Sequence, residues 1–262
     1  MKYFVVDAFA EKVFEGNPAG VCIINHWISE ELMQKIASEN NLSETAFAVK
    51  EEEQYSLRWF TPGGEVNLCG HATLATAFIL FNYYDNHLND IKFSTISGEL
   101  MVTKKGDTYE LDFPTVLSED ITVTDQMVKA LGILPKEAYL NRDLVFLLDS
   151  EEEVLNLSPD FSLLEKLPEG LGVCVTAKGR EYDFVSRGFY PKLKVNEDPV
   201  TGSLHCSLIP IWAKKLGKQE LLARQLSERG GTLYCRDEGT RVKMAGKAVL
   251  YSEAELHIQA EL

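Results

Sequence analysis

The chain has 262 residues, and its 26 lysine and arginine residues against 40 aspartate and glutamate residues give a formal net charge of −14 at pH 7. Such an acidic chain repels nucleic-acid phosphates and anionic membrane surfaces, so we expect neither nucleic acid nor a membrane as a partner. Hydrophobic residues make up 45% and charged residues 25%, as in a globular protein with a buried core. The length favours two lobes of roughly 130 residues each.

We expect no export signal and no membrane anchor. The N-terminus reaches the acidic Asp7 after a very short apolar run, which leaves no room for the apolar region of a signal peptide. The longest apolar stretch, residues 72–84, falls short of the roughly 20 residues that a spanning helix needs. Five widely spread cysteines include no C-x-x-C pair, so reduced thiols are expected. These features favour a cytoplasmic protein.

The first half of the chain predicts mixed or antiparallel β-structure. Short β-type runs alternate with turns rich in glycine and proline. The predicted strands cover residues 3–9, 19–24, 45–49, 56–60, 91–94, 100–104 and 109–113. Helical patterns interrupt them at residues 29–39 and 70–84, and Ser29 is placed to cap the first helix. The second helix is apolar on every face, which indicates a helix surrounded by a curled sheet.

The second half repeats this plan. A small helix is predicted at residues 125–131, and a second glycine-led apolar helix at residues 202–216. Strands are expected near residues 144–148, 172–177, 182–187, 232–234, 241–244 and 248–251. The apolar helices start at Gly70 and Gly202, and 202 − 70 = 132 residues is about half the chain, which suggests two similarly built lobes. The predicted lobes are residues 1–115 and residues 116–262, with terminal strands that can cross to the other lobe.

Glu44 stands where an apolar strand is predicted to begin, among residues of little charge. A carboxylate desolvated in this way has a pKa raised toward neutrality and can exchange protons with carbon. The alternative is a solvated glutamate that merely follows the helix at residues 29–39. The pattern leaves both interpretations open.

The run Cys69-Gly70-His71 opens the first apolar helix. A glycine at a helix start lets a ligand approach free backbone N–H groups, which favour a carboxylate or phosphate, and His71 adds a proton donor. Alternatively, Gly70 is a turn residue and His71 a hydrogen-bonded histidine of the first turn. Cys69 is either a thiolate nucleophile or base, or a small buried apolar residue.

The second apolar helix begins with Gly202 and Ser203, just after a short acidic run. Asp198 is a candidate to accept a substrate ammonium group or to relay a proton, while Ser203 and the Gly202 amide suit an anion. The alternative is a capping segment, with Asp198 or Thr201 as the N-cap residue.

Other functional templates are missing from the sequence. It has neither a G-x-G-x-x-G after a strand nor a G-x-x-x-x-G-K-[ST], so no nucleotide loop is expected. No G-x-S-x-G elbow points to a hydrolase triad. Cys69, His71, His205 and Cys206 are metal-ligand types, but no H-x-x-x-H or C-x-x-C spacing supports a metal site, and we expect none.

Five motifs follow one another along nearly the whole chain: GNPAG at residues 16–20, LSETAF at 42–47, RWFTP to LCGHAT at 58–73, NEDPVTGS at 196–203 and RGGTLYCR at 229–236. Together they resemble the PhzF-like family of phenazine-biosynthesis-type isomerases. The ordered set is far more specific than any one motif.

The resemblance implies a diaminopimelate-epimerase-like α+β fold. This fold has two pseudo-symmetric lobes, each a curled, mostly antiparallel, barrel-like sheet around a central helix, with the active site between the lobes. The resemblance also implies isomerisation without a cofactor, commonly in a homodimer, on a small anionic substrate.

The resemblance also implies roles for individual residues. The family's catalytic carboxylate matches Glu44, and its assisting acid, base or orienting groups match His71 and Asp198. The residues that match its substrate-binding group are Gly70, Gly202 and Ser203, with Cys69 beside them.

The related epimerases use two cysteines, each just before a helix-opening glycine. Cys69 resembles the first, but Thr201 occupies the second position and has no thiol. We therefore predict a cofactor-independent isomerase in which Glu44 moves a proton between carbons of a small carboxylic or amino acid. The alternatives are an amino-acid racemase or epimerase that uses Cys69, and a non-catalytic small-ligand-binding protein of the same fold.

Overall fold

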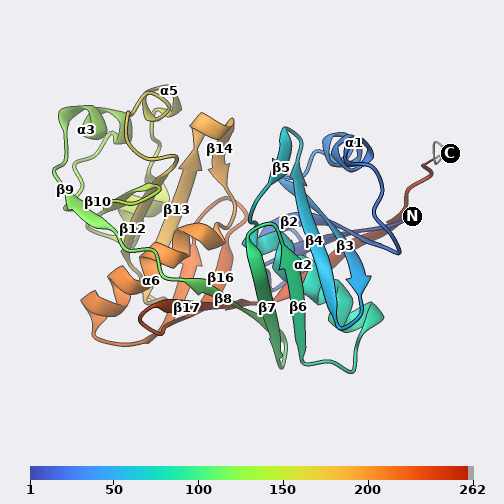
Figure 1. The fold of residues 1–262 in the computed structure, drawn as a ribbon. Helices are drawn as coiled ribbons and strands as arrows, with labels where there is room; N and C mark the ends of the chain where they lie inside the picture. The colour runs from blue at the N-terminus through green and yellow to red at the C-terminus, as the bar shows by residue number, and fades with distance from the viewer. Residues whose placement is uncertain (259–262) are drawn as a thin grey trace. The chain divides into compact units, whose positions relative to one another are not determined.

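The computed structural model describes residues 1–258, which divide into two compact units (Figure 1). The first unit comprises Met1–Asp112 and the C-terminal segment that begins at Ala245, and the second comprises Phe113–Met244. In the sequence, the second unit therefore lies between the two segments that form the first unit. Among the described residues, no helix is long and apolar enough to cross a membrane.

The first unit is built on a curled sheet. Its strands are β1 (Lys2–Ala8), β2 (Asn17–Ile24), β3 (Glu44–Glu51), β4 (Gln54–Thr61), β5 (Gly64–Val66), β6 (Asp90–Thr95), β7 (Gly98–Lys105) and β18 (Ala248–Glu255), and β8 (Thr108–Pro114) leads into the second unit. Most neighbouring strands pair antiparallel, whereas β2 with β3 and β4 with β6 pair parallel. A helix joins the two strands of each parallel pair, because a parallel connection must cross over the sheet.

The two helices of the first unit differ in their burial. α1 (Glu30–Asn40) joins β2 to β3, packs one face on β3 and β4, and is capped by the Ser29 hydroxyl, which accepts a first-turn amide N–H. α2 (Gly70–Ile79) is buried on nearly every face, because β1, β2 and β3 all pack against it. A π-helical turn, Leu80–Tyr84, extends α2, so the apolar helix predicted at residues 70–84 is confirmed.

The second unit has a sheet of the same kind. Its strands are β9 (Glu119–Ile121), β10 (Glu137–Leu140), β11 (Leu144–Leu147), β12 (Val173–Lys178), β13 (Phe184–Tyr190), β14 (Val195–Asp198), β15 (Glu220–Gln225), β16 (Gly231–Asp237) and β17 (Arg241–Gly246). Its helices are α3 (Asp125–Leu131), α4 (Glu151–Asn156), α5 (Phe161–Leu164) and α6 (Gly202–Leu216), with a 3₁₀ turn at Pro191–Leu193. The apolar helix α6 packs against β15 and β16, and its bounds confirm the helix predicted at residues 202–216.

The two units share one order of elements. In the first, β4, β5, α2 and β6 follow one another, with β5 antiparallel and β6 parallel to β4. In the second, β13, β14, α6 and β15 repeat that order and that pairing. This repeat confirms the expected α+β fold of two pseudo-symmetric lobes, each a curled sheet with a central helix.

The sequence patterns missed the strand β15, which has six residues, and the short elements β5, β9, β10, β14, α4 and α5. Strands of three or four residues carry too little alternation to stand out from a loop. The sequence did contain a signal for α4, since Ser150 accepts the Glu153 amide N–H as an N-cap and three glutamates follow it.

Candidate functional site

Glu44 is the first residue of β3, and the turn that leads into β2 helps to set its position. The Ser43 hydroxyl donates to the buried Asn17 Oδ1 at 3.1 Å, which ties the residue before Glu44 to the start of β2. Gly20 lies opposite β3, where a Cβ atom would be only 2.4 Å from Tyr3 Oη. The GNPAG motif therefore contributes to the position of the carboxylate.

Cys69 and His71 lie at the N-terminus of α2. Cys69 is the N-cap residue of α2, but its side chain accepts no hydrogen bond from the first-turn amides. The Cys69 carbonyl accepts the Thr73 amide N–H at 3.2 Å and the Thr73 hydroxyl at 2.6 Å, which fixes the first turn. First-turn amides without a side-chain cap, together with the helix dipole, favour a negative charge at this end of α2.

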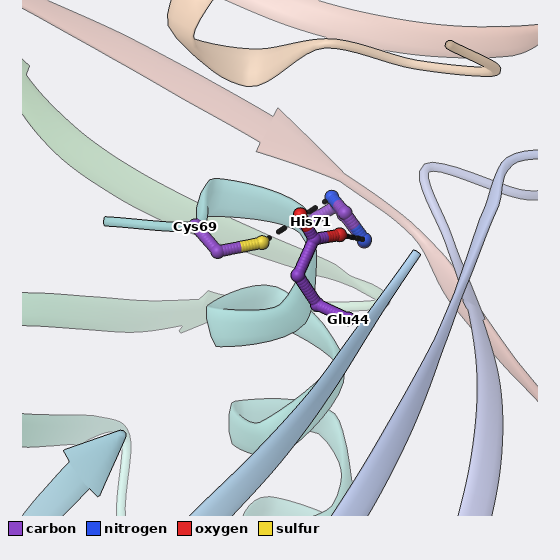
Figure 2. Close-up of side chains that lie close together, drawn as sticks. All are labelled: Glu44, Cys69 and His71. Carbon is purple, nitrogen blue, oxygen red and sulfur yellow. Dashed lines mark hydrogen bonds and ion pairs between the residues drawn. The ribbon is translucent and has the colours of Figure 1, made fainter. Parts of the chain in front are cut away.

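The imidazole of His71 lies between a carboxylate and a thiol (Figure 2). Its Nε2 is 3.1 Å from Glu44 Oε2, and its Nδ1 is 3.5 Å from Cys69 Sγ. The Nε2 and Oε2 atoms are within ion-pair distance but are not aligned as a hydrogen bond, so each is a buried polar atom without one. The three side chains form what we call the Glu44 cluster.

Burial and charge set the protonation states in the Glu44 cluster. Burial raises the pKa of the Cys69 thiol, and the Glu44 carboxylate raises it further, so the sulfur stays protonated at neutral pH. Burial alone would lower the pKa of His71, but Cys69 and Glu44 outweigh it and raise this pKa well above the ordinary value. Because the thiol is neutral, the Glu44 carboxylate is the anion that favours a protonated His71. The Glu44 side chain keeps 19% of its surface exposed.

The side chains of the Glu44 cluster, a carboxylate, a thiol and an imidazole, are also of the types that bind metal ions in proteins. One potential ligand atom from each side chain lies within 4.8 Å of the other two. His205 and Cys206, which are further metal-ligand types in the sequence, instead bond within α6. His205 Nδ1 lies 2.8 Å from the Thr201 carbonyl, and Cys206 Sγ donates to the Gly202 carbonyl at 3.8 Å.

In the second unit, Asp198 ends β14 and Thr201 is the N-cap residue of α6. The Thr201 hydroxyl donates to Asp198 Oδ2 at 2.5 Å, so it does not cap the helix. The buried Gln225 holds this segment, because its Oε1 accepts the Thr201 N–H at 2.9 Å and its Nε2 donates to the Asp198 carbonyl at 2.7 Å. A capping segment was expected as an alternative, and Thr201 is indeed the N-cap residue, although its side chain makes no cap hydrogen bond.

Ser203 lies in the first turn of α6, directly after the buried Gly202. Its hydroxyl oxygen accepts a hydrogen bond from Arg142 Nη2 at 3.0 Å. His205 lies further along the same helix, and burial lowers its pKa to about 4, so its ring is neutral at pH 7.

The predicted site residues thus fall into two groups. Glu44, Cys69 and His71 meet in the first unit, and Glu44 begins a strand rather than continuing α1, which ends at Asn40. The residues predicted at the start of α6, which are Asp198, Gly202 and Ser203, lie together in the second unit. Cys69 and Thr201 hold equivalent positions, since each is the N-cap residue of the central helix in its unit.

Two residues next to these groups were missed by the sequence analysis. Arg142 lies in the turn between β10 and β11, and Gln225 lies at the end of β15. Neither belongs to a motif with a known spacing, so the sequence pattern contains no signal for either. Their positions come from strand pairing in the second unit.

Comparison with known proteins places these features in a family. The family model described as "Phenazine biosynthesis-like protein" matches residues 6–254. An uncharacterized isomerase of Pseudomonas aeruginosa is 49% identical, and the match covers 97% of this chain and 98% of that protein. A crystal structure of a PhzF-family phenazine biosynthesis protein from Enterococcus faecalis superimposes with a TM-score of 0.97 at 54% identity, covering 98% of this chain and 99% of the other.

More distant structures share the fold. A hydroxyproline epimerase from Agrobacterium vitis, solved with bound trans-4-hydroxy-L-proline, superimposes with a TM-score of 0.62 at 10% identity. The match covers 97% of this chain and 91% of the epimerase. At this identity the likeness extends to the fold alone.

Proposed function

Since the chain belongs to the phenazine biosynthesis-like protein family, we propose that it is an isomerase that moves a proton between carbons of a small carboxylic or amino acid without a cofactor. The observation that carries this proposal is the Glu44 cluster. It pairs a partly buried carboxylate with a histidine whose pKa is raised, at the N-terminus of a buried helix. Relatives of this chain are named isomerases, which supports the same class of reaction.

In the proposed reaction, Glu44 removes a proton from a substrate carbon next to an electron-withdrawing group. The electron pair of the broken C–H bond moves into that group, and the protonated His71 stabilises the negative charge that develops there. The protonated Glu44 then returns the proton to a different carbon as the electron pair moves back. Partial burial protects the proton on Glu44 from exchange with water.

We propose that the start of α2 and the start of α6 each bind and orient an anionic group. The amide of Gly70 in the first unit, and the Ser203 hydroxyl with the amide of Gly202 in the second, each suit a carboxylate, because a helix N-terminus attracts negative charge. Asp198 is proposed to orient the substrate or assist proton transfer. Its contact with the Thr201 hydroxyl keeps it at the helix entrance.

The test is incubation of the protein with a panel of small carboxylic and amino acids in deuterated water, followed by NMR. Carbon-bound deuterium or a new isomer is expected for at least one acid, and Glu44→Gln is expected to lose that activity. The exposed Glu39 provides a matched control, since Glu39→Gln removes a carboxylate from the outer face of α1. Absence of both exchange and isomerisation for every acid, or full activity of Glu44→Gln, would refute the proposal.

A racemase or epimerase that uses Cys69 is the second candidate, because Cys69 Sγ lies 3.5 Å from His71 Nδ1. A neighbouring histidine is a common activating partner of a catalytic cysteine, and His71 is that neighbour here. Thr201 at the equivalent position of α6 is an argument against a two-thiol mechanism. Inversion of an amino acid that is lost in Cys69→Ser and retained in Glu44→Gln would favour this candidate.

Two further outcomes of the same panel have a clear meaning. Binding of an acid without any exchange, unchanged in Glu44→Gln, would indicate a non-catalytic ligand-binding protein. Activity that disappears on exhaustive chelation and returns with a divalent cation would indicate a metal site at the Glu44 cluster, whose donor atoms lie within 4.8 Å of one another. Light scattering would test the homodimer that the family resemblance implies.

A further inference from the structure

The turn between β10 and β11 presents an arginine to the start of α6. Arg142 Nη2 donates to Ser203 Oγ at 3.0 Å, in the first turn of that helix. The guanidinium places a positive charge at the start of α6, in a chain whose net charge is −14. The proposed mechanism gives this guanidinium no role.

The turn holds Arg142 rigidly. The Asn141 side chain accepts the Asp143 amide N–H at 2.9 Å, and Leu171 N–H donates to the Arg142 carbonyl at 2.8 Å. Asp143, of which 2% is exposed, accepts hydrogen bonds from Arg142 Nε at 3.1 Å and from Nη2 at 2.6 Å. The guanidinium therefore has one orientation, fixed on its inner side by a buried carboxylate.

Asp143 is itself anchored from two further directions. Its Oδ1 accepts the Gly172 amide N–H at 2.9 Å, and the Tyr190 hydroxyl lies 3.4 Å from its Oδ2. Burial and the negative charge of Asp143 raise the pKa of Tyr190 well above its ordinary value, so the phenol stays a neutral donor. A buried carboxylate with this many donors is suited to position Arg142.

The outer side of Arg142 remains available. A guanidinium has five N–H donors, and the contacts above use the one on Nε and the two on Nη2. The hydrogen bonds to Asp143 and Ser203 do not use the two donors on Nη1, and 48% of the side chain is exposed. Nη1 of a rigid, half-exposed guanidinium can donate a charge-assisted hydrogen bond to one oxygen of a carboxylate.

We propose that Arg142 is the residue that makes this enzyme specific for substrates with a free carboxylate, which it binds together with Ser203. This inference rests on the isomerase proposed above and adds the residue that distinguishes the acid from the matching amide, which does not bind. Truncation of a charge-assisted contact of this kind is expected to weaken carboxylate binding about tenfold or more. Lysine retains the charge but not the planar guanidinium that contacts Asp143 and Ser203 at the same time, so Arg142→Lys should lie between the wild type and Arg142→Met.

The test is an NMR titration of the isotope-labelled full chain with benzoate and with benzamide, which differ in charge but little in shape. The amides of Gly202 and Ser203 report binding. Arg142→Met is expected to lose about tenfold or more in affinity for benzoate, and benzamide is expected to bind neither protein. The exposed Arg180, also in the second unit, provides a control, because Arg180→Met removes an arginine that pairs with Glu152 on the surface.

Loss of Arg142 leaves the buried Asp143 without its positively charged partner, so Arg142→Met is expected to be less stable than the wild type. The double variant Arg142→Met/Asp143→Asn removes both charges and keeps the folded turn. It is expected to show the same loss of benzoate binding.

Several outcomes would overturn the inference. These are equal benzoate affinity in the wild type and the double variant, no benzoate binding by the wild type, and tighter binding of inorganic phosphate than of benzoate. Failure of the isomerase proposal looks different. In that case no acid exchanges deuterium or isomerises, yet benzoate binding still depends on Arg142.

Discussion

Nε2 of His71 lies 3.1 Å from Oε2 of Glu44, and this contact makes the protonation of the histidine depend on the carboxylate. In Glu44→Gln the anion is lost while burial remains, so we expect the pKa of His71 to fall toward or below its ordinary value. NMR titration of the His71 ring measures the change, with Glu39→Gln as the control. A His71 pKa that is the same in both variants would contradict the assignment of Glu44 as its cause.

The pH dependence of activity follows from the same pair. The raised pKa means that His71 is protonated through neutral pH and loses its proton only at higher pH. If the protonated ring stabilises the developing charge, the exchange rate should fall as pH rises through this pKa. The deuterium-exchange rate, measured across pH in the wild type and in His71→Gln, tests this, since the variant should be slow and lack that fall.

Cys69 offers a test between the two mechanisms. The thiol stays protonated at neutral pH because burial and Glu44 raise its pKa, so a Glu44-centred isomerase should tolerate its replacement. We expect Cys69→Ser to keep activity within about tenfold of the wild type, far from the loss expected for a catalytic nucleophile. Turnover numbers for the same substrate measure the difference. Abolished activity in a folded Cys69→Ser protein would favour the epimerase.

Gly20 links strand packing to the position of Glu44. A Cβ atom there would lie 2.4 Å from Tyr3 Oη and 2.8 Å from Thr45 Oγ1, so these side chains or the strands that carry them must shift to accept it. Gly20→Ala is expected to lower the free energy of unfolding by about 1–3 kcal/mol and to reduce activity. Urea unfolding measures the first effect. Gly63→Ala is the control, because its Cβ would meet nothing closer than Thr61 Oγ1 at 3.7 Å.

Gln225 holds the entrance of α6 through buried hydrogen bonds. Gln225→Leu leaves the Thr201 N–H and the Asp198 carbonyl without these partners, which should cost about 1–3 kcal/mol of stability. Activity should fall as well, because Asp198 loses its support. The exposed Gln219 gives a matched control, Gln219→Leu, which should change neither stability nor activity. A stable and fully active Gln225→Leu would show that the entrance is held in another way.

His205 should make stability depend on pH. Its pKa is about 4 in the folded protein and about 6.5 when unfolded, so between these values only the unfolded chain takes up the proton. Stability is therefore expected to fall by about 3 kcal/mol as pH drops from about 6.5 to 4, and no further from this group below that. Unfolding curves of His205→Asn should lack this component. The exposed His26 supplies the control variant His26→Asn.

Local patterns in the sequence were enough to predict the two central helices and the residues that open them. α2 and α6 are apolar on most faces, which is a property of the sequence alone, and Gly70 and Gly202 start them as predicted. Glu44 at the start of β3 was predicted in the same way, because an apolar run begins there. These features depend on residues that are close together in the chain.

Only the tertiary structure decided which side chains meet. The contact between Glu44 and His71 depends on how β3 packs against α2, and the contact between Arg142 and Ser203 depends on where the β10–β11 turn lies relative to α6. Strand register and turn position bring together residues that are distant in sequence. The periodicity of a single segment does not predict such contacts. The chemistry of each residue is therefore readable from the sequence, while its partner, its burial and its protonation state come from the fold.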